Sequence, residues 1–329
     1  MSEVLLSIKD LKTNFYTYAG VVKALDGINL DIFKGETIGL VGETGCGKSV
    51  TALSIIKLIQ SPPGRIDEGS ILFEGKDILK LKDHELRSIR GNQISMIFQE
   101  PMNSFNPVFT IGDQIAEVIM LHQKLDKKAA HDKSIEMLKF TGIPAPERVA
   151  KSYPHELSGG MLQRAMISMA LACNPKLLIA DEPTTALDVT IQAQILELMK
   201  DLKKRTGASI LMITHDLGVV ADVCDRIGVM YAGCIVELGD VRTIFFNPLH
   251  PYTKGLIGSI PKISQNVASR LDTIPGSVPN LITPPNGCRF HPRCSKAIDI
   301  CRKEKPDVYE VEGGHFVMCH LYADKKRVS

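Results

Sequence analysis

The sequence has 329 residues, of which 44% are hydrophobic and 23% charged, and its formal net charge is +2. A chain of this length can form about two domains with a sizeable core. The small net charge does not indicate nucleic acid as a partner. No run of the sequence approaches the ~20 apolar residues of a membrane span. The first residues lack the features of a secretory signal. We therefore expect a cytosolic protein.

Two aromatic residues end the first predicted strand. Residues 5–15 alternate loosely in polarity and predict a strand near one edge of a sheet, and residues 24–32 predict a second strand before a turn at 34–36. Phe15 and Tyr16 could stack on a purine ring, since every base has an apolar face. They could equally be packing residues of an edge strand.

The glycine-rich segment 42–49 has the P-loop pattern G-x-x-x-x-G-K-[ST], between a predicted buried strand at 37–41 and a predicted helix at 50–60. Its glycines allow backbone N–H groups to surround phosphate oxygens at the positive end of the helix dipole. Lys48 would reach the outer phosphates and the Ser49 hydroxyl would bind Mg²⁺. The predicted nucleotide-binding residues of this segment are Gly42, Glu43, Thr44, Gly45, Cys46, Gly47, Lys48, Ser49 and Val50. The sequence therefore predicts a protein that binds a nucleoside triphosphate.

The middle of the chain predicts a mainly helical insertion. Residues 94–98 form a compact apolar strand that ends at Gln99, and the two prolines of 100–107 are expected to interrupt regular structure. Residues 110–142 have a helical pattern with one apolar face, formed by Ile111, Ile115, Val118 and Ile119. We expect this insertion to separate two α/β halves.

An alternation of strands and helices returns from residue 177. Strands are predicted at 177–180, 209–213 and 227–231, with helices between them and Gly207 as a helix C-cap. This alternation predicts a mostly parallel sheet covered on both faces. Ligands of such sheets bind beyond the carboxyl ends of the strands, where Gly42, Asp181 and His215 fall.

Acidic residues at the end of the 177–180 strand suit metal-assisted phosphate hydrolysis. Asp181 can hold Mg²⁺ directly or through water, while Glu182 can polarise the attacking water. His215 follows the next strand and could contact the terminal phosphate or orient that water. The acidic pair is informative because it follows a P-loop.

The composition changes after about residue 239, where prolines replace the α/β pattern, and we predict a domain boundary near Asp240. Four cysteines then follow with the spacing C-x5-C-x6-C-x17-C, at Cys288, Cys294, Cys301 and Cys319. In a reducing compartment such thiols more often bind metal than form disulfides. They could hold a tetrahedral zinc, with a nearby histidine (291, 315 or 320) in place of one thiolate, or a 4Fe-4S cluster, or be reduced structural cysteines.

Further motifs identify a family. Residues 157–161 (LSGGM) resemble the signature motif of ATP-binding cassette (ABC) ATPases, although most members carry glutamine where Met161 stands. Gln99 resembles the Q-loop glutamine of that family, residues 186–188 its D-loop with Asp188, and His215 its switch histidine. Segments 98–107 and 247–253 are similar to the oligopeptide/dipeptide (peptide/nickel) importer subgroup, so the resemblance covers almost the whole chain.

The resemblance implies an α/β fold: a P-loop NTPase (RecA-like) core at 1–240 with a mostly parallel sheet, a helical subdomain at about 100–170, and a Pro/Cys-rich extension at 241–329. It implies catalytic roles for Glu182, His215 and Gln99, with Ser49, Gln99 and Asp181 as Mg²⁺ ligands. Ser158, Gly159, Gly160 and Asp188 would complete the ATP site of a second ABC ATPase subunit, identical or different. For the four cysteines it favours a 4Fe-4S cluster over zinc.

The implied function is ATP-driven import of di- and oligopeptides from the cytoplasmic face of the membrane. The path would be supplied by transmembrane permease subunits, with an extracytoplasmic peptide-binding protein as an indirect partner and no nucleic acid. Two alternatives stay open: a soluble ABC ATPase in nucleic-acid or translation control, and a cassette for nickel or another solute. Soluble relatives usually have tandem cassettes, coiled-coil insertions or basic surfaces, which this sequence does not show.

Overall fold

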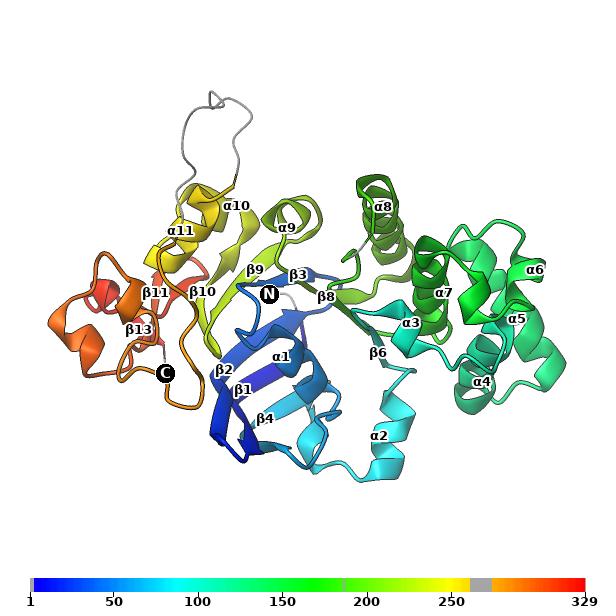
Figure 1. Cartoon of the computed structure of the whole chain (residues 1–329), viewed down its shortest axis with the longest axis horizontal. Coiled ribbons are helices and arrows are strands. Elements are labelled where there is room, and N and C mark those ends of the chain that lie inside the picture. The colour runs from blue at the N-terminus through cyan, green and yellow to red at the C-terminus, as the bar shows by residue number, and fades with distance from the viewer. Residues whose placement is uncertain (1–2, 186, 261–273, 329) are drawn as a thin grey trace. The chain divides into compact units, whose positions relative to one another are not determined.

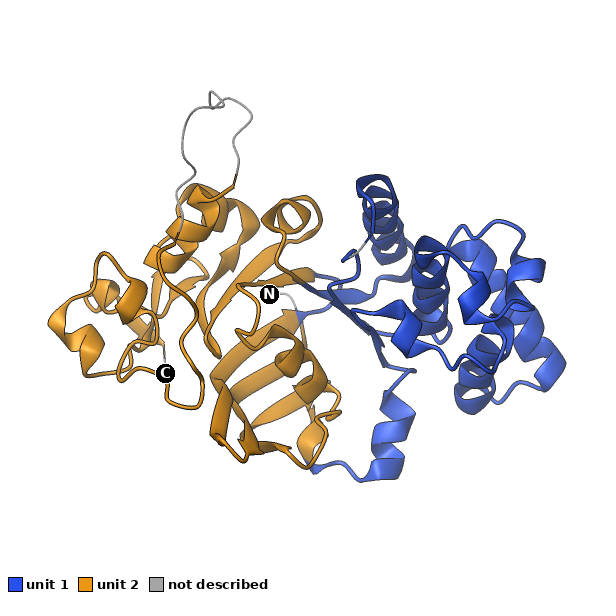
Figure 2. Cartoon of the chain, viewed as in Figure 1, with its two compact units in different colours: residues 1–3, 33–36, 80–213 blue, residues 4–32, 37–79, 214–329 orange. Residues whose placement is uncertain are grey.

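The computed structural model describes residues 3–185, 187–260 and 274–328 (Figure 1). The chain forms two compact units (Figure 2): unit 1 comprises residues 1–3, 33–36 and 80–213, and unit 2 comprises residues 4–32, 37–79 and 214–329. The boundary predicted near Asp240 lies inside unit 2, at the end of a strand, and stays a prediction. Within the described ranges, no helix is long and apolar enough to cross a bilayer.

Unit 2 contains an antiparallel sheet with the strand order β2-β1-β4-β5. Its strands are β1 (Val4–Thr17), β2 (Gly20–Phe33), β4 (Gly64–Phe73) and β5 (Lys76–Asp77). The first strand was expected near one edge of a sheet, and β1 lies second in this order, between the edge strand β2 and β4. A loose alternation of polar and apolar residues indicates that one face of a strand is buried, but not how many strands pair with it. The partner strand β4 is far from β1 in the sequence.

A second group of unit 2 strands has the order β13-β11-β12-β10-β9-β3. β3 (Thr37–Val41) pairs in parallel with β9 (Arg226–Tyr231), as predicted. The remaining strands pair antiparallel, and they are β10 (Cys234–Asp240), β11 (Val308–Glu312), β12 (His315–Val317) and β13 (Lys326–Val328). None of these four strands was predicted from the sequence. The unit 2 helices are α1 (Lys48–Ile55), α9 (Leu217–Val223), α10 (Val241–Phe246) and α11 (Pro251–Gly258).

Unit 1 contains three parallel strands in the order β8-β7-β6. They are β6 (Ile94–Ile97), β7 (Leu177–Asp181) and β8 (Ser209–Thr214), close to the predicted ranges. The helices are α2 (Asp83–Ile89), α3 (Pro101–Ser104), α4 (Ile111–Gln123), α5 (Lys127–Phe140), α6 (Pro146–Ala150), α7 (Gly159–Leu171) and α8 (Val189–Thr206). Ile111, Ile115 and Ile119 are buried, as the apolar face of the insertion predicted.

Two local predictions are wrong. The helix expected at 50–60 begins at Lys48 and ends at Ile55, because Lys57 is left-handed (φ 51°) and Leu58 N–H bonds to the Leu53 carbonyl. The segment 100–107, expected to lack regular structure, contains the single turn α3. Pro101 takes the first helical position, where its missing N–H costs no intrahelical hydrogen bond.

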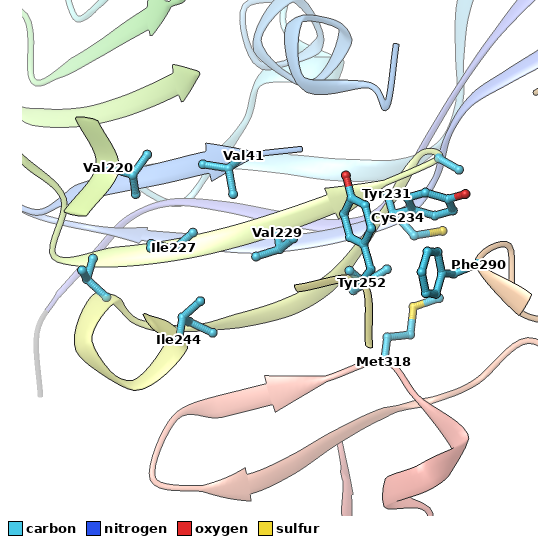
Figure 3. Close-up of a cluster of buried hydrophobic side chains, with 13 residues drawn as sticks. Val41, Val220, Ile227, Val229, Tyr231, Cys234, Ile244, Tyr252, Phe290 and Met318 are labelled. Atoms are coloured by element: carbon cyan, nitrogen blue, oxygen red, sulfur yellow. The ribbon is translucent and has the colours of Figure 1, made fainter. Parts of the chain in front are cut away.

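The C-terminal region packs into the core of unit 2 (Figure 3). Phe290 and Met318 are buried against residues of β9 and the helices that follow it. The Phe290 ring lies 5.0 Å from the Tyr231 ring and 5.4 Å from the Tyr252 ring, and the two tyrosine rings are 4.7 Å apart. Each such pair stabilises by about 0.5–1.5 kcal/mol beyond its buried area. The extension is therefore part of the body that carries the P-loop.

Candidate nucleotide-binding site

The predicted phosphate loop adopts a backbone that requires glycine. Gly42, Gly45 and Gly47 have φ values of 154°, 80° and 109°. A Cβ atom at Gly42 would lie 2.2 Å from the Met230 carbonyl oxygen, and one at Gly47 would lie 2.9 Å from the Ala24 carbonyl oxygen. Only glycine permits this close approach of the loop to β9 and β2.

Lys48 lies inside the loop. Its side chain is buried, and Nζ donates hydrogen bonds to the carbonyl oxygens of Gly42 (2.7 Å) and Glu43 (3.3 Å). Cys46 is fully buried, and burial raises the pKa of its thiol, which supports a packing role for this residue. The loop thus holds one cation at the start of α1, next to the positive end of the helix dipole.

The two aromatic residues lie at the end of β1. Phe15 pairs with Gly64, and a Cβ atom at Gly64 would lie 2.9 Å from the Phe15 ring, so Phe15 packs on that glycine. Tyr16 is 48% exposed, and its hydroxyl donates to Asp67 (3.0 Å). Stacking of either ring on a purine stays a prediction.

His215 also belongs to unit 2. It is exposed between β8 and the N-cap of α9, where Asp216 accepts hydrogen bonds from the N–H groups of Gly218 (2.7 Å) and Val219 (3.3 Å). This cap fixes the start of α9 directly after the histidine.

The predicted catalytic carboxylates of unit 1 lie at the end of β7. Asp181 is buried as the last residue of the strand, and Glu182 follows with φ 48°. A left-handed glutamate costs about 1–3 kcal/mol, a strain that functional sites often contain. The Glu182 carboxylate accepts hydrogen bonds from Gln99 (3.2 Å) and from Thr185 (2.8 Å). The structure therefore brings Gln99 and Glu182 together and adds Thr185, which was not predicted from the sequence.

The residues of the signature and D-loop segments begin two helices of unit 1. Ser158 is the N-cap of α7, and its hydroxyl accepts from Met161 N–H (3.4 Å), with Gly159 and Gly160 in the first turn. Asp188 is the N-cap of α8 and accepts from Ile191 N–H (2.9 Å). Ala186 of the predicted D-loop lies outside the described residues.

Comparison with known proteins identifies the family of this chain. The family model "ABC transporter" matches residues 25–185, and "Oligopeptide/dipeptide transporter, C-terminal region" matches residues 236–301. The oligopeptide transport ATP-binding protein OppD of Bacillus subtilis (strain 168) is 54% identical over 96% of this chain and 88% of its own length. Its relative AppD from the same organism is 53% identical over 98% of both chains. This chain belongs to the ABC transporter ATP-binding family.

Solved structures confirm the predicted fold class of this ABC ATPase. An ATP-binding cassette determined as a dimer in a post-hydrolysis state with ADP and Pi matches with a TM-score of 0.65 and 28% identity, over 72% of this chain and 99% of its own. The cassette cbiO1 from Clostridium perfringens matches with a TM-score of 0.62 and 29% identity, over 74% of this chain and 92% of its own.

The four late cysteines of the ABC ATPase are free and lie near one another. Burial raises the pKa of Cys288 to about 12 and that of Cys319 to about 11, and the neighbouring cysteines add to both shifts. Cys288 N–H also bonds to the Cys301 carbonyl (2.9 Å). Within the part of the chain that the structure describes, no group of three or more His, Cys, Asp or Glu residues is arranged to hold a metal ion.

The three histidines that could replace a thiolate have other hydrogen-bond partners. His315 pairs with the buried carboxylate of Glu237 (2.8 Å), His320 contacts the Glu304 carbonyl (2.9 Å), and His291 contacts the Cys288 carbonyl (3.0 Å). Each of these contacts uses one of the two ring nitrogens, as the second nitrogen of a metal-binding histidine also does.

Two residues at the phosphate loop were missed because they come from the C-terminal region. Tyr252 and Arg293 both contact Glu43. The importer-like segment 247–253 contains Tyr252, and it was the signal in the sequence that could have drawn attention to this residue.

Proposed function

We propose that this ABC ATPase powers the import of di- and oligopeptides through membrane-embedded permease subunits, as a peripheral subunit at the cytoplasmic face of the membrane. This proposal rests on similarity to peptide-transport proteins over almost the whole chain. A relative named for oligopeptide transport is 54% identical over 96% of this chain, and one named for dipeptide transport is 50% identical over 97% of it. The extension adds support. The model "Oligopeptide/dipeptide transporter, C-terminal region" matches residues 236–301, most of which lie in the 241–329 extension.

We assign the nucleotide phosphates to residues 42–50, with the ring of Phe15 or Tyr16 near the base. The glycine conformations and the buried Lys48 support this assignment. The hydroxyl of Ser49, the carboxylate of Asp181 and the amide oxygen of Gln99 are oxygen donors of the kind that Mg²⁺ prefers. Bound Mg²⁺ would neutralise phosphate charge, while Glu182 polarises the attacking water and His215 contacts the terminal phosphate.

One chain supplies only part of each site in this proposal. Ser158, Gly159 and Gly160 begin the 13-residue helix α7, whose N-terminal amides can bind a phosphate held on the loop of a second cassette. Asp188 lies at the corresponding N-terminus of α8. The solved relative in a dimeric, ADP-bound state supports two cassettes that close over nucleotide and reopen after hydrolysis. We assign residues 1–240 to this cassette, with a helical part at about 100–170.

We also propose a 4Fe-4S cluster on Cys288, Cys294, Cys301 and Cys319 in the 241–329 extension. The mutual proximity of four free thiols supports it, because four cysteine thiolates are the ligand set of such a cluster. The bound cluster would supply a redox-active or structural crosslink. Iron and acid-labile sulfide in equal amounts are expected in anaerobically purified protein. Zinc alone, or no metal, would contradict this assignment.

Reconstitution tests the transport function. The ATPase, its permease subunits and the binding protein are assembled in lipid vesicles, and ATP hydrolysis and solute uptake are measured together. Peptide-loaded binding protein should stimulate hydrolysis, and peptide should accumulate. Uptake of nickel in place of peptide, or an active ATPase that never associates with membrane protein, would contradict the proposal.

A further inference from the structure

Arg293 connects the C-terminal extension to the phosphate loop. It ends a short 3-10 helix (His291–Arg293), 250 positions after Glu43 in the sequence. Nη1 donates to Glu43 Oε2 (2.7 Å) and Nη2 donates to Glu43 Oε1 (3.0 Å), a bidentate pair. The side chain of Arg293 is 6% exposed and that of Glu43 is 29% exposed. Such a fork fixes the orientation of both groups, which a single point charge would not do.

The guanidinium is itself held in place. Nε donates to the Pro275 carbonyl (2.8 Å), Nη2 also donates to the Ile274 carbonyl (3.4 Å), and Nη1 also donates to the Tyr231 hydroxyl (3.4 Å). Arginine has five N–H donors, and these contacts together with the two to Glu43 use all of them. Arg293 therefore cannot rotate away without breaking several hydrogen bonds at once.

A second residue from the C-terminal region holds the backbone of Glu43. The Tyr252 hydroxyl accepts a hydrogen bond from Glu43 N–H (3.0 Å), and Tyr252 is fully buried among aromatic rings. The Glu43 carbonyl in turn accepts from Cys46 N–H (3.2 Å) and from Lys48 Nζ (3.3 Å). Glu43 thus links the extension to the groups that would face the phosphates.

The charge of Glu43 gives Arg293 a second effect. A carboxylate in a phosphate-binding loop repels the anionic nucleotide unless a cation neutralises it. Arg293 supplies that cation from outside the loop, at 2.7 Å. Loss of Arg293 would therefore free the Glu43 side chain and expose the nucleotide to an uncompensated negative charge.

We propose that the C-terminal extension is a positioning element of the nucleotide site, in which Arg293 acts through Glu43, with Tyr252, to hold the loop ready for phosphate. This inference rests on the proposed assignment of residues 42–50 to ATP binding. It makes nucleotide affinity depend on a segment that lies outside the residues 25–185 matched by the cassette model.

A double-mutant cycle on the full chain tests the inference, with the Kd for ATP and Mg²⁺ measured by titration calorimetry. Arg293→Ala should raise Kd by about 5- to 20-fold, the range of a moderate coupling between sites. Glu43→Gln should raise Kd less, because it removes the charge that requires compensation. In the Glu43→Gln background, Arg293→Ala should have little further effect, which a purely structural role for Arg293 would not produce.

Two further variants complete the design. Lys305→Ala is the matched control, since Lys305 joins the extension to Asp26 (3.0 Å) and the pair does not include a loop residue; its Kd should equal the wild-type value. Arg293→Lys keeps the charge but not the fork, and should give an intermediate Kd. If Arg293→Ala does not fold, Arg293→Lys replaces it in the double-mutant cycle.

The outcomes separate the two proposals. A wild-type Kd in Arg293→Ala, or an equal loss in both Glu43 backgrounds, overturns the positioning role. Lys48→Ala is measured in parallel, and normal binding in that variant would instead overturn the assignment of the loop itself.

Discussion

The side-chain amide of Gln99 donates a 3.2 Å hydrogen bond to the carboxylate of Glu182. Thr185 donates a second hydrogen bond, of 2.8 Å, to the same oxygen atom. These contacts orient the carboxylate at the end of β7, next to the buried Asp181. A general base has to be oriented in this way before it can act on water.

Glu182→Gln should lower kcat for ATP hydrolysis by about 10²-fold or more, because an amide cannot accept the proton of water. The affinity for ATP should stay unchanged, since the loop at 42–50 is intact. Phosphate release and equilibrium binding measure the two quantities. Glu197→Gln, at an exposed position of α8, is the control. Normal turnover in Glu182→Gln would remove this residue from its assigned role.

Thr185→Ala should lower kcat about fivefold, because the lost hydrogen bond is worth about 1 kcal/mol. Thr185→Ser retains the hydroxyl and should restore most of the activity. Steady-state kinetics of the two variants, compared at saturating ATP, checks this. If serine and alanine lower kcat equally, the hydroxyl does not orient Glu182.

Lys48→Ala should raise the Kd for ATP by about tenfold or more, because charge-assisted hydrogen bonds to phosphate are lost. Calorimetric titration measures Kd, and circular dichroism verifies that the variant is folded, since Lys48 is a buried residue. Lys57→Ala, two residues beyond the end of α1, is the control. An unchanged Kd in Lys48→Ala would contradict the P-loop assignment.

Stability should depend on the titration of His250. Burial lowers the pKa of His250 to about 4, and Nδ1 of the neutral ring accepts from Tyr252 N–H (3.1 Å). The unfolded chain binds this proton first, at a pKa of about 6.5. The contribution to stability is therefore complete above about pH 6.5 and is lost as the pH falls toward 4, by up to about 3 kcal/mol.

Urea unfolding between pH 7 and pH 4 measures this dependence. Other carboxylates titrate at the acid end, so the informative quantity is the difference from His250→Asn, which keeps a cap acceptor without the titrating ring. The variant should show a flatter curve between about pH 6.5 and 5. Parallel curves for the two proteins would show that His250 is not the titrating group.

The elements that could be predicted from the sequence are those encoded locally. The loop at 42–49 combines its pattern with a strand and a helix on either side, and Ser158 and Asp188 precede helices in their own segments. Short apolar runs likewise predicted β7 and β8 within a few residues, and Gly207 predicted the C-terminal end of α8. Each of these features depends on neighbours in the chain.

The features that were missed depend on tertiary contacts. The interior position of β1 is set by β4, and the role of Arg293 depends on Glu43, 250 positions away. Local patterns contain no information about such partners. The hairpin of β11 and β12 is a different case, because its signal was local and was overlooked. Residues 309–312 alternate apolar and acidic side chains, and Gly313 and Gly314 lie at the turn before β12.

Under the proposed function, one chain cannot complete its own nucleotide site. A structure of the Glu182→Gln variant in the assembled transporter, with ATP and Mg²⁺ bound, is the decisive test. We expect Ser158 of each cassette to contact the terminal phosphate of the ATP held by the loop of the other. Ser158 remote from every terminal phosphate, in an assembly with both loops filled, would contradict it.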